Sequence, residues 1–306
     1  MKRPHSYTSK IMLAGEYGVL VGGAALTIPL KRYNVRVRKR GDIPDGKAGE
    51  AELSRKYLVS IYNYIRDLPP GAFHAGPDMD LFSGNLENFW LEMNIPTGCG
   101  LGSSGAVSAA IYDLFFPEAE NISLANQKED LALIESYFHG KSYGMDALAC
   151  HAGYALLFHE DGSVQKVEFQ PEKIPGGYRF FLLDSGTRLE TALLVKYFLG
   201  QMKNPLFAES IRNEYLVMNL KLIETLLGQR EADPALIFRA ISDYQFTNFR
   251  RMIPDIVLDL WIEGQVSNEY YLKLNGSGGG FMLGITHHTS VKSLDQRWKE
   301  QIIWIE

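Results

Sequence analysis

A glycine-rich segment near the middle of the chain has the residue types and spacing of a phosphate-binding loop. Gly98, Gly100 and Gly102 alternate with other residues, and Ser103 and Ser104 follow at once. Alternating glycines let the backbone turn tightly, so that successive N–H groups converge on an anion, and a helix beginning at the serines adds its N-terminal dipole. A serine hydroxyl there can bond a phosphate oxygen or ligate Mg²⁺. The segment favours a polyphosphate ligand, although a serine-capped turn from strand to helix has the same pattern.

Three rival motifs fit this region less well. Residues 100–105 match G-x-G-x-x-G, but the preceding strand alternates in polarity, and Glu118 and Glu120 lie in a polar loop instead of after a buried second strand. Residues 139–142 resemble the tail of a Walker A loop, yet Glu135 occupies the position of its leading glycine. No serine lies in a G-x-S-x-G elbow. A dinucleotide-dependent enzyme therefore stays as an alternative, below a phosphate-transferring one.

A second glycine-rich segment, residues 276–280, lies between two strand-like stretches near the C-terminus. A flexible hairpin is the default explanation of one such segment. Two glycine clusters in one chain make a phosphate-binding role more favourable than a flexible hairpin, because a second backbone can then approach the phosphates or the transferring group. We expect Gly276, Ser277 and Gly278 to make that approach.

Composition limits the classes of function. The 306 residues are 46% hydrophobic and 22% charged, which is typical of a globular protein of two domains or one large one. The net charge of −5 provides no basic field for nucleic acid or an anionic membrane. The two cysteines, Cys99 and Cys150, are too few for a disulfide framework. Residues 1–5 are not followed by the apolar core of a signal peptide. Glu16 interrupts the apolar stretch 11–30, which argues against a transmembrane span. We expect a cytoplasmic protein without nucleic-acid or membrane partners.

Periodicity and turn residues predict an α+β fold of two lobes. Strands are expected at 10–13, 33–38, 89–95, 154–158, 164–169, 178–183, 270–274, 281–285 and 301–305. Helices are expected at 52–65, 104–115, 123–138 and several times between 190 and 263. Prolines and paired glycines in 170–177 mark a boundary. The predicted domains are therefore 1–172 and 173–306.

Three motifs resemble, in order, those of the GHMP kinases, the superfamily of galactokinase, homoserine kinase, mevalonate kinase and phosphomevalonate kinase. The first is residues 10–29, which contain a lysine, a Gly-Glu pair and a later proline. Residues 96–106 are similar to the central phosphate-binding motif, and residues 273–280 to the C-terminal glycine motif. The three matches bracket nearly the whole chain, so together they are far more specific than any one of them.

Residues 135–146 are most similar to mevalonate kinase, in the segment that joins a metal-binding glutamate to a catalytic aspartate. By position, the resemblance implies that Asp146 is the base or orienting carboxylate for the acceptor hydroxyl, with Lys10 beside it. It also implies that Glu135 and Ser104 hold Mg²⁺. The residues make this chemically sensible: Glu135 falls at the edge of an apolar helix stripe, where a cation would satisfy it, and Asp146 is expected just ahead of an apolar strand.

The resemblance implies an N-terminal lobe of the ribosomal protein S5 domain 2-like type and a ferredoxin-like C-terminal lobe. It also implies transfer of the γ-phosphoryl group of ATP, with Mg²⁺, to a hydroxyl or phosphate of a small metabolite. The residues expected to contact ATP are Pro96, Gly98, Gly100, Leu101, Gly102, Ser103, Ser104, Gly276, Ser277 and Gly278. A catalytically idle ATP-binding sensor on the same scaffold is the alternative.

The acceptor stays open between mevalonate, phosphomevalonate, a sugar and another small alcohol. Ser142 and Tyr143 stand where mevalonate kinases have a Pro-Ser pair, and a bulky phenol would reshape the acceptor pocket. Residues 184–191 are similar to a second-lobe segment of mevalonate and phosphomevalonate kinases, with Arg188 and Thr191 as candidates to bind an acceptor carboxylate or phosphate. The oligomeric state is open as well, with a homodimer among the options.

Overall fold

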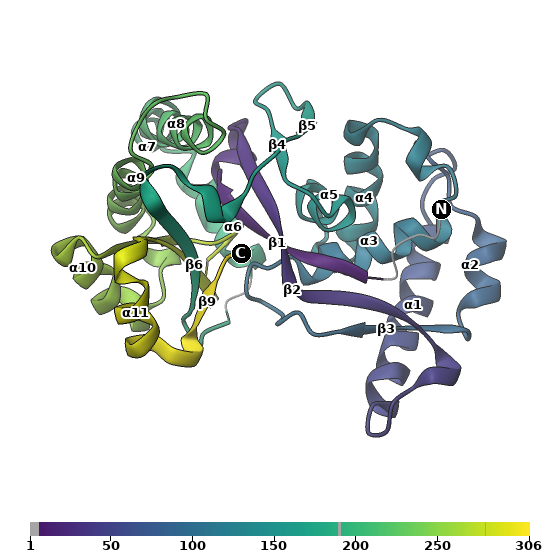
Figure 1. The fold of residues 1–306 in the computed structure, drawn as a ribbon. Coiled ribbons are helices and arrows are strands. Elements are labelled where there is room, and N and C mark those ends of the chain that lie inside the picture. Colours follow the sequence, from purple (N-terminus) through teal and green to yellow (C-terminus); the bar gives the residue numbers. More distant parts are fainter. Residues whose placement is uncertain (1–5, 189–190, 279) are drawn as a thin grey trace. The chain divides into compact units, whose positions relative to one another are not determined.

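Helices and strands both build the fold, as the sequence predicts for an α+β protein (Figure 1). The computed structural model describes residues 6–188, 191–278 and 280–306. Residues 1–5, from which we predicted the absence of a signal peptide, lie outside the described residues. Gly279 of the third motif lies outside them as well.

Packing divides the chain into two units that interleave along the sequence. Unit 1 comprises the chain up to Lys10, residues 29–96 and residues 102–154, and unit 2 comprises residues 11–28, 97–101 and 155–306. The predicted division at residue 172, into an S5-like and a ferredoxin-like lobe, stays a prediction.

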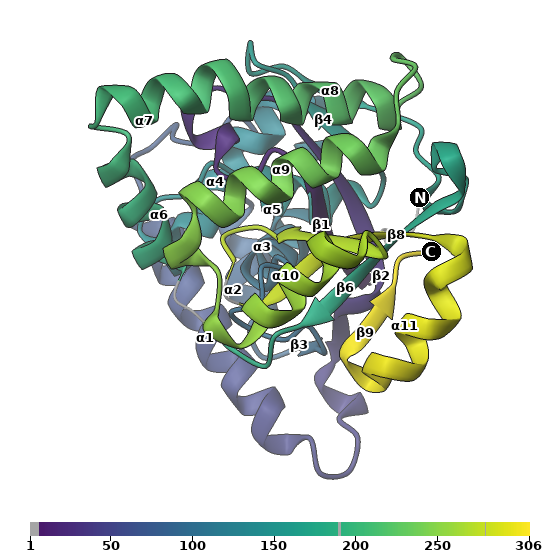
Figure 2. The ribbon, with the colours of Figure 1, turned by 90° about the vertical axis from the view of Figure 1, so that its left-hand side faces the viewer.

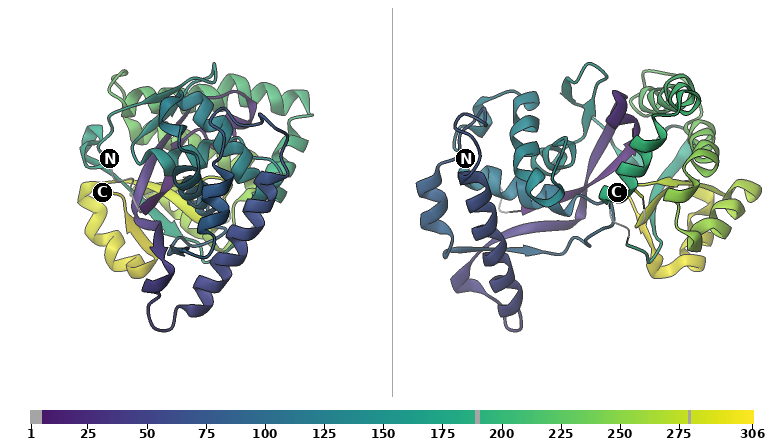
Figure 3. Two further views of the ribbon diagram at one scale, coloured as in Figure 1. Left: turned by 90° about the vertical axis from the view of Figure 1, so that its right-hand side faces the viewer. Right: turned by 180° about the vertical axis from the view of Figure 1, so that it is seen from behind.

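Unit 1 contains five α-helices in its described part. These are α1 (Ala48–Arg66), α2 (Met79–Asn85), α3 (Ser103–Phe115), α4 (Leu124–His139) and α5 (Met145–Ala152). Helix α3 packs on both α4 and α5, and its small buried residues Ala106, Ala109 and Ala110 permit a close approach (Figure 1). Helix α1 packs along strand β3 (Phe89–Met93), which can be followed in Figure 3. The N-terminus of α3 is thereby placed beside α4 and α5.

Strands β1 (Ser6–Ala14) and β2 (Ala25–Lys39) each run from one unit into the other. In unit 1, β2 pairs antiparallel with β3, with Val35 opposite Met93. In unit 2, residues 25–27 of β2 pair with β4 (Leu156–Phe158), which forms a hairpin with β5 (Val164–Lys166). The two strands predicted at 154–158 and 164–169 are therefore confirmed, although both are shorter than predicted.

The second sheet lies wholly in unit 2 and is antiparallel, in the order β7-β8-β6-β9. Its strands are β6 (Tyr178–Asp184), β7 (Tyr270–Leu274), β8 (Phe281–His287) and β9 (Ile302–Trp304), close to the predicted ranges. The helices of unit 2 are α6 (Thr191–Gln201), α7 (Pro205–Ser210), α8 (Leu216–Leu226), α9 (Pro234–Asn248), α10 (Leu258–Ser267) and α11 (Val291–Trp298). Helix α8 lies beside α9, and α9 packs on β7 (Figure 2).

One local prediction was wrong. The apolar stretch after Asp146 was expected to be a strand, but it forms α5, and Asp146 lies in the first helical turn. Its residues Ala147, Leu148 and Ala149 are all buried, and small side chains suit packing on α3 better than a pleated strand. Within the described residues, none of the helices combines the length and the apolar character that a bilayer span demands.

Candidate active site

Lys10 and Asp146 form an ion pair in unit 1. The Nζ atom of Lys10 lies 2.9 Å from Oδ1 of Asp146, and the lysine side chain is 1% exposed while the aspartate is 36% exposed. Burial alone lowers the pKa of Lys10, but the charge and hydrogen bond of Asp146 outweigh it and leave the pKa raised. The lysine therefore stays protonated beside a carboxylate that solvent can still reach.

The backbone around Asp146 explains its placement. Gly144 precedes α5 in the left-handed region, with φ of +71°, and turns the chain into the helix. Gly105 in α3 lets the two helices meet, because a Cβ atom there would lie 2.8 Å from the carbonyl carbon of Asp146. The first turn of α5 is thus fixed against the first turn of α3.

Glu135 is the centre of a polar cluster in the same unit. Its side chain is buried, Ser104 Oγ donates to Oε1 at 3.0 Å, and Ser142 Oγ donates to Oε2 at 2.5 Å. His139 Nε2 lies 2.9 Å from Ser104 Oγ. Burial, followed by the charge of Asp146, raises the pKa of Glu135 to about 7. Such a carboxylate is satisfied when a cation approaches it.

The structure therefore brings together all four residues predicted for catalysis and metal binding, Lys10, Ser104, Glu135 and Asp146. In the described part of the chain, no three or more His, Cys, Asp or Glu side chains are grouped as metal ligands. Mg²⁺ usually takes only one or two protein carboxylates and completes its shell with water and phosphate oxygens. Glu135 and Ser104 fit such a partial donor set.

Helix α3 offers an uncapped N-terminus next to this cluster. The helix begins at Ser103, and Gly102 at its N-cap has φ of +76° and supplies no side-chain hydrogen bond. The first N–H groups of a helix have no partner within the helix, so they are suited to bind an anion. Pro96, Gly102, Ser103 and Ser104 of the predicted loop belong to unit 1.

The rest of that loop, residues 97–101, packs in unit 2 directly against the C-terminal glycine segment. A Cβ atom on Gly100 would lie 2.6 Å from the carbonyl oxygen of Asn275, and one on Gly280 would lie 2.4 Å from Cα of Cys99. Gly98, Gly100, Leu101, Gly276, Ser277 and Gly278 all belong to this unit. The two glycine-rich segments are thus neighbours, although about 175 residues separate them in the chain.

We expect Gly100→Ala to destabilise unit 2 by more than the ordinary cost of a left-handed alanine, which is about 1–2 kcal/mol. Alanine is disfavoured at the φ of +75° of this position, and its Cβ atom would also collide with the carbonyl oxygen of Asn275. Gly228→Ala is the matched control, because Gly228 has φ of +71° and nothing within 4 Å of its added Cβ. Urea unfolding of both variants measures the difference, and equal losses would contradict the close packing of the two segments.

Residues 57–154 match the family model of the GHMP kinases N terminal domain. This part of the chain carries the N-terminal domain of the GHMP kinases. No curated protein matches it in sequence.

Solved structures share the fold of this protein over nearly its whole length. L. major mevalonate kinase in complex with R-mevalonate has a TM-score of 0.64 at 16% identity, covering 99% of this chain and 95% of that one. Lactococcus lactis galactokinase complexed with galactose has a TM-score of 0.65 at 13% identity, covering 98% and 91%. Streptococcus pneumoniae phosphomevalonate kinase in complex with phosphomevalonate and AMPPNP has a TM-score of 0.61 at 18% identity, covering 98% of both chains. The predicted α+β fold of the GHMP kinases is confirmed.

Sequence reasoning missed two supporting interactions in this protein. Ser142, one of the departures from the mevalonate kinase pattern, donates to Glu135 and accepts from the N–H of Gly144 at 3.0 Å. Glu16 and Lys273 form an ion pair whose side chains are both 0% exposed. The available signal was Lys273 itself, because a charge inside an otherwise apolar strand must find a partner.

The two predicted acceptor contacts lie beside the glycine segments of unit 2. Arg188 pairs through both of its terminal nitrogens with Asp184, at 3.0 and 3.2 Å, and a Cβ on Gly98 would lie 3.6 Å from the Cβ of Arg188. Thr191 Oγ1 lies 2.9 Å from Ser277 Oγ. In unit 1, the half-exposed ring of Tyr143 has Lys141 Nζ 5.5 Å from its centre.

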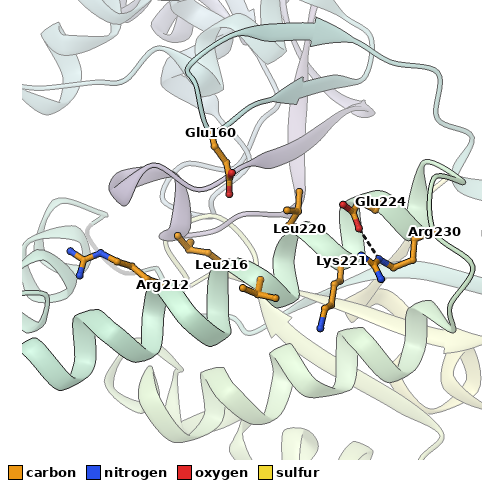
Figure 4. Close-up of a pocket in the computed structure, with 8 residues that line it drawn as sticks. Glu160, Arg212, Leu216, Leu220, Lys221, Glu224 and Arg230 are labelled. Carbon is orange, nitrogen blue, oxygen red and sulfur yellow. Dashed lines mark hydrogen bonds and ion pairs between the residues drawn. The ribbon is translucent and has the colours of Figure 1, made fainter.

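A pocket of about 170 Å³ lies along α8 (Figure 4). Its lining combines three apolar side chains with five charged ones: Leu216, Val217, Leu220, Glu160, Arg212, Lys221, Glu224 and Arg230. None of the residues predicted from the sequence lines it. Its link to the motifs is indirect, because Leu216 also packs against Gly18 and Gly23 of the first motif.

Proposed function

We propose that this protein is an ATP-dependent kinase that transfers the γ-phosphoryl group to a hydroxyl or phosphate of a small metabolite. The observation that carries the proposal is the buried Lys10 held 2.9 Å from the partly exposed Asp146, in one cluster with Glu135 and Ser104. Structures that share the fold hold R-mevalonate, galactose or phosphomevalonate, which are small hydroxyl- or phosphate-bearing acceptors. A protein that only senses ATP has no chemical need for the cluster.

Asp146 and Lys10 have complementary tasks in this proposal. Oδ1 of Asp146 accepts from Lys10, and Oδ2 is the oxygen that we assign to receive or orient the proton of the acceptor hydroxyl. The ammonium would stabilise negative charge that develops on the transferring group. Positioning and electrostatics of this kind supply most of the acceleration in phosphoryl transfer.

The remaining residues bind the donor. Within unit 1, the uncapped N-terminus of α3 would bind phosphate oxygens of the donor, and Ser104 and Glu135 would hold Mg²⁺. Within unit 2, the glycine-rich segments remain our predicted nucleotide contacts. ATP with Mg²⁺ supplies the phosphoryl group and partial neutralisation of its charge. Arg188 and Thr191 remain our candidates for contact with the acceptor.

Calorimetry tests the proposal. We expect ATP to bind in the presence of Mg²⁺, with weaker binding after Mg²⁺ is chelated, and NAD to give no heat of binding. Binding of NAD in preference to ATP would favour the dinucleotide-dependent alternative and overturn the proposal.

We expect Glu135→Gln to raise the Mg²⁺ concentration needed for half-maximal activity by about 10–100-fold, as losses around metal sites commonly do. Glutamine keeps the shape and a hydrogen-bond acceptor for Ser104 but loses the charge. Glu129→Gln on the same helix is the matched control, because its carboxylate is 64% exposed and pairs with His74. An unchanged Mg²⁺ requirement in Glu135→Gln would remove Glu135 from the metal site.

A further inference from the structure

Three consecutive residues of the first motif form hydrogen bonds or an ion pair with three different parts of unit 2. The N–H of Gly15 donates to Oδ1 of Asn219 at 2.8 Å. The carboxylate of Glu16 pairs with Lys273, and the hydroxyl of Tyr17 donates to the carbonyl oxygen of Ser277 at 2.6 Å. Two of these three bonds reach the C-terminal glycine segment or the strand that leads into it.

The strand leading into the segment is held by a buried polar chain. The hydroxyl of Tyr215 donates to the carbonyl of Glu16 at 2.9 Å, and it accepts from Nε2 of Gln245 at 2.8 Å. Oε1 of Gln245 accepts from the N–H of Leu274 at 2.7 Å. The end of β7 is therefore fixed, and the glycine segment starts from a rigid base.

Tyr17 holds an uncommon backbone conformation. Its φ of +59° lies in the left-handed region, which disfavours residues with a Cβ atom. The ring is 3% exposed, and its centre lies 4.9 Å from that of Phe198 and 5.5 Å from that of Phe249. The buried ring packs against both phenylalanines, and its hydroxyl reaches Ser277.

Ser277 is held from its other side as well. Its Oγ lies 2.9 Å from Oγ1 of Thr191 at the start of α6, and the next residue, Gly278, donates its N–H to the carbonyl of Asn275 at 3.2 Å. Glycines flank Ser277, so the backbone has little stiffness of its own. The bonds from Tyr17 and Thr191 supply that stiffness.

We propose that Tyr17 is a positioning residue which, together with Thr191, fixes the turn of residues 275–278 in the conformation that receives the nucleotide. The proposal rests on the nucleotide-binding function proposed above. A glycine-rich turn that is free before binding loses much conformational entropy when a ligand orders it, which weakens affinity. A turn already held by two side chains loses less conformational entropy on binding. Tyr17 and Thr191 therefore strengthen binding by preorganising the turn.

Tyr17→Phe tests the proposal while it keeps the ring packing. We expect faster amide hydrogen exchange at residues 276–278 in the nucleotide-free protein, and a dissociation constant for a non-hydrolysable ATP analogue weaker by roughly fivefold, as for one lost hydrogen bond. Tyr244→Phe is the matched control, because this buried tyrosine belongs to the same aromatic cluster and bonds Ser210 instead. The control should leave both quantities unchanged.

A second test does not disturb the buried ring. Thr191→Val and Ser277→Ala each remove the same hydroxyl contact, so each should weaken analogue binding by a similar factor, and the double variant should be no worse than either single one. Additive losses would show that the two hydroxyls act separately and would overturn the role of Thr191.

The outcomes separate this proposal from the function on which it rests. Unchanged exchange at residues 276–278 in Tyr17→Phe would overturn the proposal that Tyr17 fixes this turn. Faster exchange with unchanged analogue affinity overturns its role in nucleotide positioning. Failure of the unmodified protein to bind the analogue refutes the proposed function and the positioning role with it. Faster exchange in Tyr17→Phe would then still show that Tyr17 orders the turn, so the error would lie in the identity of the ligand.

Discussion

Replacement of Asp146 by asparagine is expected to lower turnover by roughly 10²–10⁴-fold, the usual contribution of a positioned acid or base. This loss corresponds to about 3–5 kcal/mol of transition-state stabilisation. Asparagine keeps the size of the side chain and a hydrogen-bond acceptor for Lys10, but it can neither take a proton nor balance the charge of the ammonium. Steady-state kinetics with a saturating acceptor measures the effect.

Nucleotide affinity should change far less than turnover in Asp146→Asn, because the residue acts on the acceptor. Asp80→Asn is the control, since this exposed aspartate lies in the first turn of α2 and contacts none of the predicted site residues. Turnover of Asp146→Asn equal to that of the control would remove Asp146 from the mechanism.

The second large effect concerns stability. Lys273→Met is expected to lower the free energy of unfolding by about 3–5 kcal/mol, the cost of breaking a buried ion pair from one side. The variant removes the cation from Glu16 in a place where both side chains are 0% exposed. It also removes the bond from Lys273 Nζ to the carbonyl of Leu274 at 3.2 Å. Urea unfolding measures the loss.

Two controls identify the cause of that loss. The double variant Glu16→Leu with Lys273→Met should recover most of the stability, because an apolar pair of similar volume leaves no buried charge. Arg230→Met breaks the exposed pair with Glu224 at 2.7 Å and should cost less than about 1 kcal/mol. A loss in Lys273→Met no larger than in Arg230→Met would contradict the importance of the buried pair.

Local patterns were enough to find the cluster in unit 1. Ser104 follows a glycine-rich turn, and Glu135 and Asp146 lie within one short segment, so their spacing can be compared with a known pattern directly. The contact between Lys10 and Asp146 is long-range, and only the family resemblance predicted it. The mistaken strand after Asp146 shows the limit of periodicity, since a short apolar run fits a buried strand and a buried helix equally well.

The interactions of unit 2 were beyond the reach of local patterns. Glu16 and Lys273 are 257 positions apart, and Tyr17 and Ser277 are 260 apart. Lys273 inside an apolar strand indicates that a partner must exist, but the sequence does not say which residue it is, and Glu16, Tyr17 and Ser277 look ordinary in their own segments. The positive φ of Tyr17 was equally hidden, because the residue type gives no sign of it.

Acceptor-dependent formation of ADP is the most direct test of the central claim that this site transfers phosphoryl groups. The protein is incubated with ATP and Mg²⁺ alone and with mevalonate, phosphomevalonate, sugars and other small alcohols in turn. The proposal predicts that at least one acceptor raises ADP formation well above the background and that Asp146→Asn abolishes most of that increase. Tight binding of ATP without turnover on any acceptor would contradict the proposal and identify the protein as a nucleotide sensor.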